Sequence, residues 1–238
     1  MPEPLVVAFV VGVTPGKWAR AWQERMPRHP LTLLPLGQHA ALAALADGTA
    51  QLALLRLPLD TESAGLSTIP LYAERPVVVA ATGHAIEAAD SVTLAELAGF
   101  GILPTGDADP DWNDETGWAN AVAVAATNAA VAIMPQSVAR AHSRKDVVAR
   151  PVTDAPETRI ALAWPTAATT AATTDAVQEF IGIVRGRTAN SSRGAQAEDP
   201  AGRPAPRQAA KRSPAANRSP AAKTARPWSK LKPRGKKR

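Results

Sequence analysis

The sequence predicts an α/β protein followed by a basic tail that cannot form a core. Continuous apolar runs alternate with helical patterns over the first 57 residues. A further continuous apolar run, with three valines at its centre, covers residues 76–81. Such runs are typical of fully buried strands. From residue 186 onward the apolar periodicity stops, and Pro, Ala, Arg, Lys and Ser dominate, so this segment cannot bury enough surface to offset the entropy of ordering it.

Three strands are expected in the first 57 residues. They are the apolar runs at residues 5–11, 31–36 and 51–57. Because helical patterns separate them, they form a β-α-β-α-β unit, which is half of a doubly wound sheet. Ligands of such sheets bind in the crevice at the carboxyl ends of the strands.

Two helices connect these strands. The first carries Trp18 and Trp22, four residues apart and therefore on one face. Thr14 stands where an N-cap belongs, and Pro15 stands at the first helical position. The second helix covers residues 38–47 and is followed by a glycine that suits a C-cap.

The rest of the first 186 residues continues the alternation. After the buried run at 76–81, Ser91 or Thr93 is expected to begin a short helix. Further elements are expected at residues 99–104 (strand), 118–127 (helix), 130–134 (strand), 137–142 (helix, with Ser137 as a candidate cap), 147–154 and 158–164 (segments leading back to the first half) and 175–185 (closing helix). The acidic stretch at 105–116 lacks the glycine and spacing of a calcium loop, so we interpret it as a solvated turn.

Charge divides the 238-residue chain into an acidic and a basic part. Residues 1–184 hold 11 Lys and Arg against 19 Asp and Glu, whereas residues 185–238 hold 16 against 2. This asymmetry suggests a polyanionic partner for the basic part. The chain has no cysteine, which excludes disulfides and thiol chemistry. The apolar run near the N-terminus is too short to span a bilayer, so we expect a cytoplasmic protein with no membrane partner.

No pattern in the sequence assembles a catalytic or metal site. The four histidines, His29, His39, His84 and His142, show no paired spacing for a metal. No nucleophile elbow, Walker loop or dinucleotide-binding glycine motif occurs. We therefore expect neither an enzyme nor a cofactor.

Three motifs resemble the effector-binding domain of LysR-type transcriptional regulators. Residues 44–56, ALADGTAQLALLR, match a helix end and strand of that family, with Gln51 where the family usually has Asp. Residues 76–97 are similar to its buried strand followed by a Gly-His turn and a Leu-Ala-Glu-Leu helix. Residues 127–140, TNAAVAIMPQSVAR, are similar to a third motif, although the family's glycines are replaced by Asn and Ala. The resemblance covers roughly residues 4–186.

The resemblance implies a two-lobed, periplasmic-binding-protein-like fold. We assign residues 1–81 with 158–184 to a first α/β lobe and residues 82–157 to a second lobe. We expect the second lobe to be shortened, because the acidic stretch stands where the family has a strand and a helix. Residues 185–238 are assigned to a disordered tail rich in Lys, Arg, Pro and Ala. Family members carry a winged helix-turn-helix ahead of this module, and we expect it to be absent here because the chain starts at the first strand.

The resemblance also implies that a small-molecule effector, an anionic metabolite, binds between the lobes and regulates transcription. Thr14 and Gly16 are the first candidates, because a hydroxyl and free amides at a helix N-terminus suit an anion. The alternative is that Thr14 only caps the helix. Pro104 and Thr105 are expected to face the cleft from the other lobe.

Arg56 and Leu57 are further candidates at the end of the third strand. The Arg56 guanidinium suits a planar carboxylate. The alternative is that Arg56 forms a surface ion pair with Asp60 or Glu62.

Two macromolecular partners are also expected. The resemblance implies a homodimer through the first helix, although core packing explains at least one of Trp18 and Trp22. The tail is expected to bind nucleic acid by charge, and residues 233–236, PRGK, are similar to part of an AT-hook. The expected contacts are Lys230, Lys232, Arg234, Lys236, Lys237 and Arg238. The alternative function is a nucleic-acid-associated protein that acts through this tail, with the globule as a dimerisation or docking piece; a tail that only aids solubility is the simplest alternative.

Overall fold

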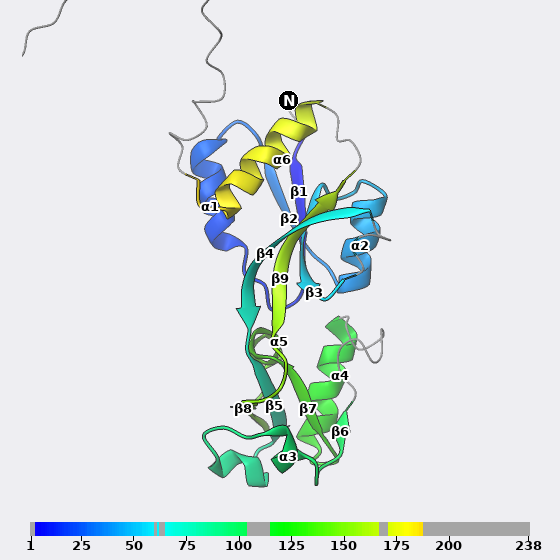
Figure 1. Ribbon diagram of the computed structural model, residues 1–238, viewed down its shortest axis with the longest axis vertical. Helices are drawn as coiled ribbons and strands as arrows, with labels where there is room; N and C mark the ends of the chain where they lie inside the picture. The colour runs from blue at the N-terminus through cyan, green and yellow to red at the C-terminus, as the bar shows by residue number, and fades with distance from the viewer. Residues whose placement is uncertain (1–2, 60, 62–64, 104–114, 167–170, 188–238) are drawn as a thin grey trace, which may run out of the picture. The chain divides into compact units, whose positions relative to one another are not determined.

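A computed structural model describes residues 3–59, 61, 65–103, 115–166 and 171–187. These residues belong to one compact unit and form two sheets with their helices (Figure 1). The predicted tail beyond residue 187 and most of the acidic stretch at 105–116 lie outside the described residues. The expected disorder of the tail and the expected shortening of the second lobe therefore stay predictions.

Within the described residues, the first sheet has five strands in the order β2-β1-β3-β9-β4. The strands are β1 (Leu5–Phe9), β2 (Leu31–Pro35), β3 (Leu52–Leu57), β4 (Leu66–Glu74) and β9 (Thr158–Pro165). β1 is parallel to β2 and β3, whereas β9 is antiparallel to β3 and β4. The expected β-α-β-α-β unit is confirmed.

Three helices pack on the first sheet: α1 (Gly16–Arg25), α2 (Gln38–Ala46) and α6 (Ala171–Val184). Figure 1 shows α1 and α6 on one side of the sheet and α2 on the other. Trp18 and Trp22 are both buried in the core of the first sheet, and the Trp22 ring lies 5.9 Å from that of Phe180 on α6. Core packing thus accounts for both tryptophans, so they are not the exposed anchors of a dimer.

The sequence did not predict β4, because a proline interrupts its pattern. Pro70 lies in the middle of this strand, where the pairing with β9 shifts register between Pro70 and Tyr72. Proline has no N–H to donate and is tolerated in sheets at edges and bulges. β4 satisfies both conditions, since it is the edge strand of the first sheet.

The second sheet has four strands within the described residues, in the order β6-β7-β5-β8. They are β5 (Pro76–Ala81), β6 (Ile102–Leu103), β7 (Val131–Pro135) and β8 (Val147–Pro151). The three valines of β5 are buried, as its continuous apolar run predicted. We expected the first lobe to extend to residue 81, but the pairing of β5 with β7 and β8 places it in the second sheet. The crossover lies at Arg75, between the end of β4 and the start of β5.

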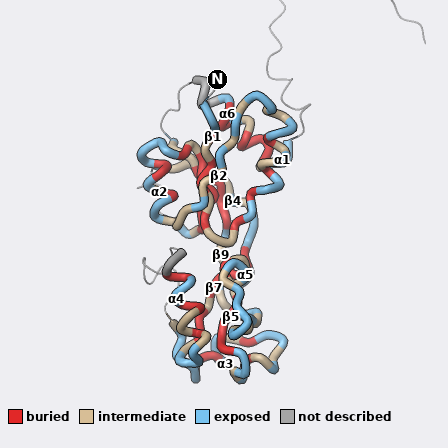
Figure 2. The backbone as a smooth tube through the Cα atoms, turned by 180° about the vertical axis from the view of Figure 1, so that it is seen from behind, coloured by how far each residue is buried: buried red, intermediate tan, exposed pale blue. Residues whose placement is uncertain are grey.

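Short helices and one long helix complete the second lobe: η1 (Ala85–Ala88), α3 (Leu94–Leu97), α4 (Glu115–Ala126) and α5 (Gln136–Ala141). Thr93, one of the two residues expected to start this helix, is the N-cap of α3 and forms a reciprocal capping box with Glu96. Asn128 adopts a φ of +63° before β7, which Asn tolerates better than most residues. Figure 2 shows that the buried residues follow the strands and the inward sides of the helices.

Candidate functional site

A cavity of about 860 Å³ lies beside the start of α1. It is lined by Gly12, Val13, Thr14, Gly16, Lys17, Trp18, Tyr72, Ser137, Arg140 and Ala141. These residues come from the β1–α1 turn, the first turn of α1, strand β4 and helix α5, so elements of both lobes form the wall. The charged residues in this lining are Lys17 and Arg140, and both are cations.

Thr14 and Gly16, the predicted anion contacts, lie together in this wall. The helix begins one residue later than expected, with Pro15 as N-cap and Gly16 as the first helical residue. Pro15 accepts the amide protons of Trp18 and Ala19 through its carbonyl, and no side-chain hydrogen bond caps α1 within the described residues. The prediction that Thr14 caps the helix is therefore wrong; Thr14 is exposed and lines the cavity instead.

The two cations of the cavity have no anionic partner among the described residues. The Lys17 Nζ lies 4.5 Å from the ring centroid of Trp18, an attraction to the electron-rich face of the indole. Arg140 is exposed, and its guanidinium has no hydrogen-bond or ion-pair partner in the described part of the chain. The cavity is thus positively charged although residues 1–184 carry more Asp and Glu than Lys and Arg.

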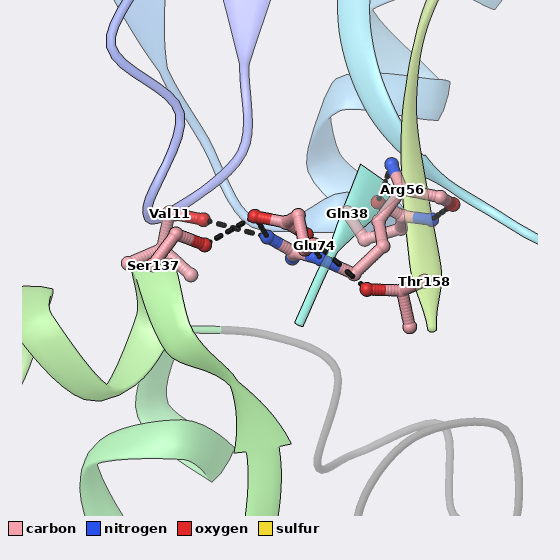
Figure 3. Close-up of polar contacts among 6 residues, drawn as sticks. All are labelled: Val11, Gln38, Arg56, Glu74, Ser137 and Thr158. Carbon is pink, nitrogen blue, oxygen red and sulfur yellow. Dashed lines mark hydrogen bonds and ion pairs between the residues drawn. The ribbon is translucent and has the colours of Figure 1, made fainter. Parts of the chain in front are cut away.

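Arg56 does not line this cavity but forms a buried ion pair (Figure 3). Its Nε lies 2.7 Å from Oε2 of Glu74, its Nη2 lies 3.3 Å from Oε1, and the two residues are only 7% and 5% exposed. Nη2 also donates to the Val11 carbonyl at 3.1 Å. The expected surface partners, Asp60 and Glu62, lie outside the described residues. Because Glu74 neutralises Arg56, this guanidinium is not free to bind an effector.

Three further side chains complete the network around this pair. Gln38 holds the Arg56 backbone on both sides, since its Nε2 donates to the Arg56 carbonyl at 2.6 Å and its Oε1 accepts from the Arg56 amide at 3.1 Å. Thr158 donates to Oε2 of Glu74 at 3.3 Å, and Ser137 donates to Oε1. Such partners are what a buried carboxylate requires.

Helix α5 contacts the β1–α1 turn at Gly12. This residue has a φ of +87°, and a Cβ added to it would lie 2.6 Å from the Ser137 Oγ and 2.9 Å from the Ser137 carbonyl carbon. Glycine therefore satisfies two demands here, a left-handed backbone and close approach of another chain segment. The Ser137 hydroxyl does not cap α5, which begins at Gln136 with Pro135 as its N-cap, but donates to Glu74 instead.

Tyr72 lines the cavity close to the buried pair. Burial raises the pKa of this phenol above its ordinary value, and the negative charge of Glu74 raises it further, while Arg56 opposes the change. The phenol is thus neutral at physiological pH and can both donate and accept a hydrogen bond.

The other predicted contacts are not brought to this cavity. Leu57 lines a separate cavity of about 390 Å³, together with Pro58, Leu59, Thr61, Thr68, Glu157 and Arg159. Pro104, Thr105 and the six predicted nucleic-acid contacts at 230–238 lie outside the described residues. Among the residues that are described, no group of three or more His, Cys, Asp or Glu side chains could hold a metal ion. No helix in the same part of the chain is long and apolar enough to cross a membrane.

Sequence reasoning did not select four residues that the structure places at the site: Tyr72, Glu74, Ser137 and Arg140. Ser137 and Arg140 both stand in the motif at 127–140, three residues apart, and this spacing puts them on the same side of α5. That spacing was the available signal. Nothing local marked Glu74, whose partners are remote in sequence.

Residues 15–119 match the family model of the LysR substrate binding domain. Solved structures also match. A mutant OxyR regulatory domain from Pseudomonas aeruginosa has 19% sequence identity and a TM-score of 0.58, with 78% of this chain and 97% of that chain covered. For a reduced form of OxyR the identity is 18%, the TM-score 0.61 and the coverage 80% and 98%. The effector binding domain of a BenM variant has 16% sequence identity and a TM-score of 0.60, with 80% of this chain and 96% of that chain covered.

These structural matches establish the two-lobed, periplasmic-binding-protein-like fold that the sequence motifs predicted. No curated protein sequence matches this chain. Over residues 15–119 the chain thus matches the LysR substrate binding domain, and its fold is similar to those of the OxyR and BenM domains.

Proposed function

We propose that this chain is a sensing module that binds a small anionic metabolite and reports it to a transcription-regulating assembly in the cytoplasm. The observation that carries the proposal is the charge of the 860 Å³ cavity. Its two charged lining residues are cations without an anionic partner among the described residues, in a part of the chain that is otherwise acidic. Unpaired cations that converge on a cavity favour an anionic occupant.

The remaining walls support a carboxylate with a compact apolar body. Thr14 and Ser137 offer hydroxyl donors, and the first amides of α1 have no intrahelical partner and point toward an anion at the helix start. Trp18, Tyr72 and Ala141 supply apolar surface. A ligand held in this way contacts the first lobe and α5 at once, so its binding favours one arrangement of the lobes over others.

A thermal-shift screen of carboxylates, each paired with its neutral amide, tests the proposal. A carboxylate that binds the native state raises the melting temperature, whereas its amide should not, because it lacks the charge that the cations attract. Arg140→Gln should reduce the shift. Arg144→Gln serves as the matched control, since Arg144 is also exposed but lies outside the cavity lining and pairs with Asp146. Equal shifts with amides, or an unchanged shift in Arg140→Gln, would contradict the proposal.

The dimer through α1 is a separate proposal. Since Trp18 and Trp22 face the core, the contact surface of α1 would consist of its exposed residues, which are Gly16, Lys17, Arg20, Gln23 and Glu24. Sedimentation of the full chain, compared with an Arg20→Glu variant, tests whether these side chains join two copies.

A second candidate function is nucleic-acid binding by the tail. The observation that favours it is the excess of 16 Lys and Arg over 2 Asp and Glu in residues 185–238. Such an excess attracts phosphates without reading sequence. On this alternative, the globule serves as a dimerisation or docking piece.

A further inference from the structure

Ser137 belongs to two sites at once. Ser137 lines the cavity, and its hydroxyl donates a hydrogen bond to Oε1 of Glu74 in the buried network (Figure 3). A serine hydroxyl carries one proton and can donate it to one acceptor at a time. An anion in the cavity and the Glu74 carboxylate are both acceptors that need this proton.

We propose that the anionic ligand of the cavity competes with Glu74 for the Ser137 proton, so that ligand binding releases Glu74 from helix α5. This inference rests on the proposed function, because it names the residue through which a ligand in that cavity acts. Arg140, on the same side of α5, provides the positive charge that draws the ligand's carboxylate to Ser137.

The Glu74 carboxylate keeps hydrogen-bond donors when Ser137 turns away from it. Glu74 keeps the two bonds from the Arg56 guanidinium and the bond from Thr158. The backbone of Ser137 is held against Gly12, so a rotation about the serine side chain redirects the proton while the helix stays in place. The exchange therefore costs one hydrogen bond and restores one to the ligand.

The exchange also weakens the attachment of α5 to the first lobe. Glu74 is the last residue of β4, directly before the crossover at Arg75, and the Gln136 amide donates to the Arg75 carbonyl at 2.9 Å. Ser137 and Gln136 thus hold the start of α5 to consecutive residues of the crossover. Loss of the Ser137 bond leaves the Gln136 bond alone at this point, and α5 opens more readily.

Calorimetric titration with phenylacetate and its neutral isostere phenylacetamide tests the competition in a cycle of variants. Ser137→Ala should weaken phenylacetate binding by less than the about tenfold that one hydrogen bond to a charged acceptor is worth, because the bond that Glu74 gives up offsets part of the gain. Glu74→Gln should strengthen it, because the competing charge is gone. In a chain that already carries Ser137→Ala, adding Glu74→Gln should not change the affinity for phenylacetate further, since the shared proton is absent. Ser143→Ala is the matched control, because Ser143 is exposed and lies outside the cavity.

Glu74→Gln leaves Arg56 partly unpaired, so hydrogen exchange provides a readout that does not need this variant. Saturation with phenylacetate should accelerate exchange of the α5 amides in the unaltered chain, although ligands ordinarily slow it. In Ser137→Ala these amides should exchange fast with or without phenylacetate. Phenylacetate that binds equally well to the unaltered chain and to Ser137→Ala, or that slows exchange in α5, would overturn this inference alone. Absence of carboxylate binding in both chains would overturn the proposed function with it.

Discussion

Replacement of Arg56 by methionine should be the most destabilising single change at the site. Arg56→Met keeps the length of the aliphatic stem but removes the guanidinium that binds Glu74 and the Val11 carbonyl. With Arg56 7% and Glu74 5% exposed, water cannot replace the lost partner. Among the described residues, Glu74 is then left as a buried charge with two hydroxyl donors, Ser137 and Thr158.

The expected loss follows from this geometry. Removal of one partner of a buried ion pair costs about 3–5 kcal/mol, because the other charge stays buried and uncompensated. Replacement of both partners by apolar residues is often close to neutral. The double variant Arg56→Met with Glu74→Leu still leaves the Ser137 and Thr158 hydroxyls without their acceptor, at a cost of about 1 kcal/mol each, so it should recover about 1–3 kcal/mol of the loss.

Urea unfolding followed by circular dichroism measures both variants against the unaltered chain. The single variant should also melt roughly 6–20 °C lower, given about 2–4 °C per kcal/mol for a domain of this size. The reasoning would be refuted by a single variant that loses less than about 1 kcal/mol, or by a double variant less stable than the single one. Either result would mean that Glu74 is solvated or protonated in the folded chain.

Three other predictions address separate features. Tyr72 is the single tyrosine, and its pKa is raised by burial and by the charge of Glu74. Its phenolate absorbance should therefore titrate with a midpoint above 10. The stability that this group contributes is present below pH 10 and is lost as the pH rises through its folded pKa. A midpoint at or below that of a free tyrosine would contradict this. Gly12→Ala should cost at least about 1–2 kcal/mol for its positive φ alone, with a further loss from overlap with Ser137, measurable by denaturation; a neutral substitution would show that α5 does not rest on this turn. The full chain should bind duplex DNA with a slope of log K against log salt of about −7, if roughly half of the tail's cations contact phosphates. A chain ending at Gly186 should not bind. If the shortened chain still binds, the contact lies on the acidic globule instead.

Local patterns in the sequence were sufficient for most of the secondary structure. The apolar runs predicted β1, β2, β3 and β5, and Thr93, one of the two expected starts of the short helix, is the N-cap of α3. These signals depend on neighbouring residues, whose side-chain periodicity and capping preferences act within a few positions. The same local reasoning missed β4, because Pro70 is acceptable only at a sheet edge, and the edge is known only once the strand order is known.

The candidate site was predicted only in part, for the same reason. Thr14 and Gly16 were found because a helix start is visible in the sequence, and both line the cavity. Arg56 was predicted as a ligand contact at the end of the third strand, but its partner Glu74 is 18 residues away and reaches it through the pairing of β3 and β4 with β9. Ser137 is 63 residues from Glu74.

The sequence by itself thus determined the α/β class, the division of charge and the helix start that suits an anion. Only the tertiary structure decided which cations stay unpaired: it buried Arg56 against Glu74 and brought Arg140 to the wall that Lys17 shares. The physical reason is that the charge of an ionic side chain is available to a ligand only if no opposite charge lies within a few ångströms. That distance depends on strand order and on the crossover at Arg75, which no local pattern encodes.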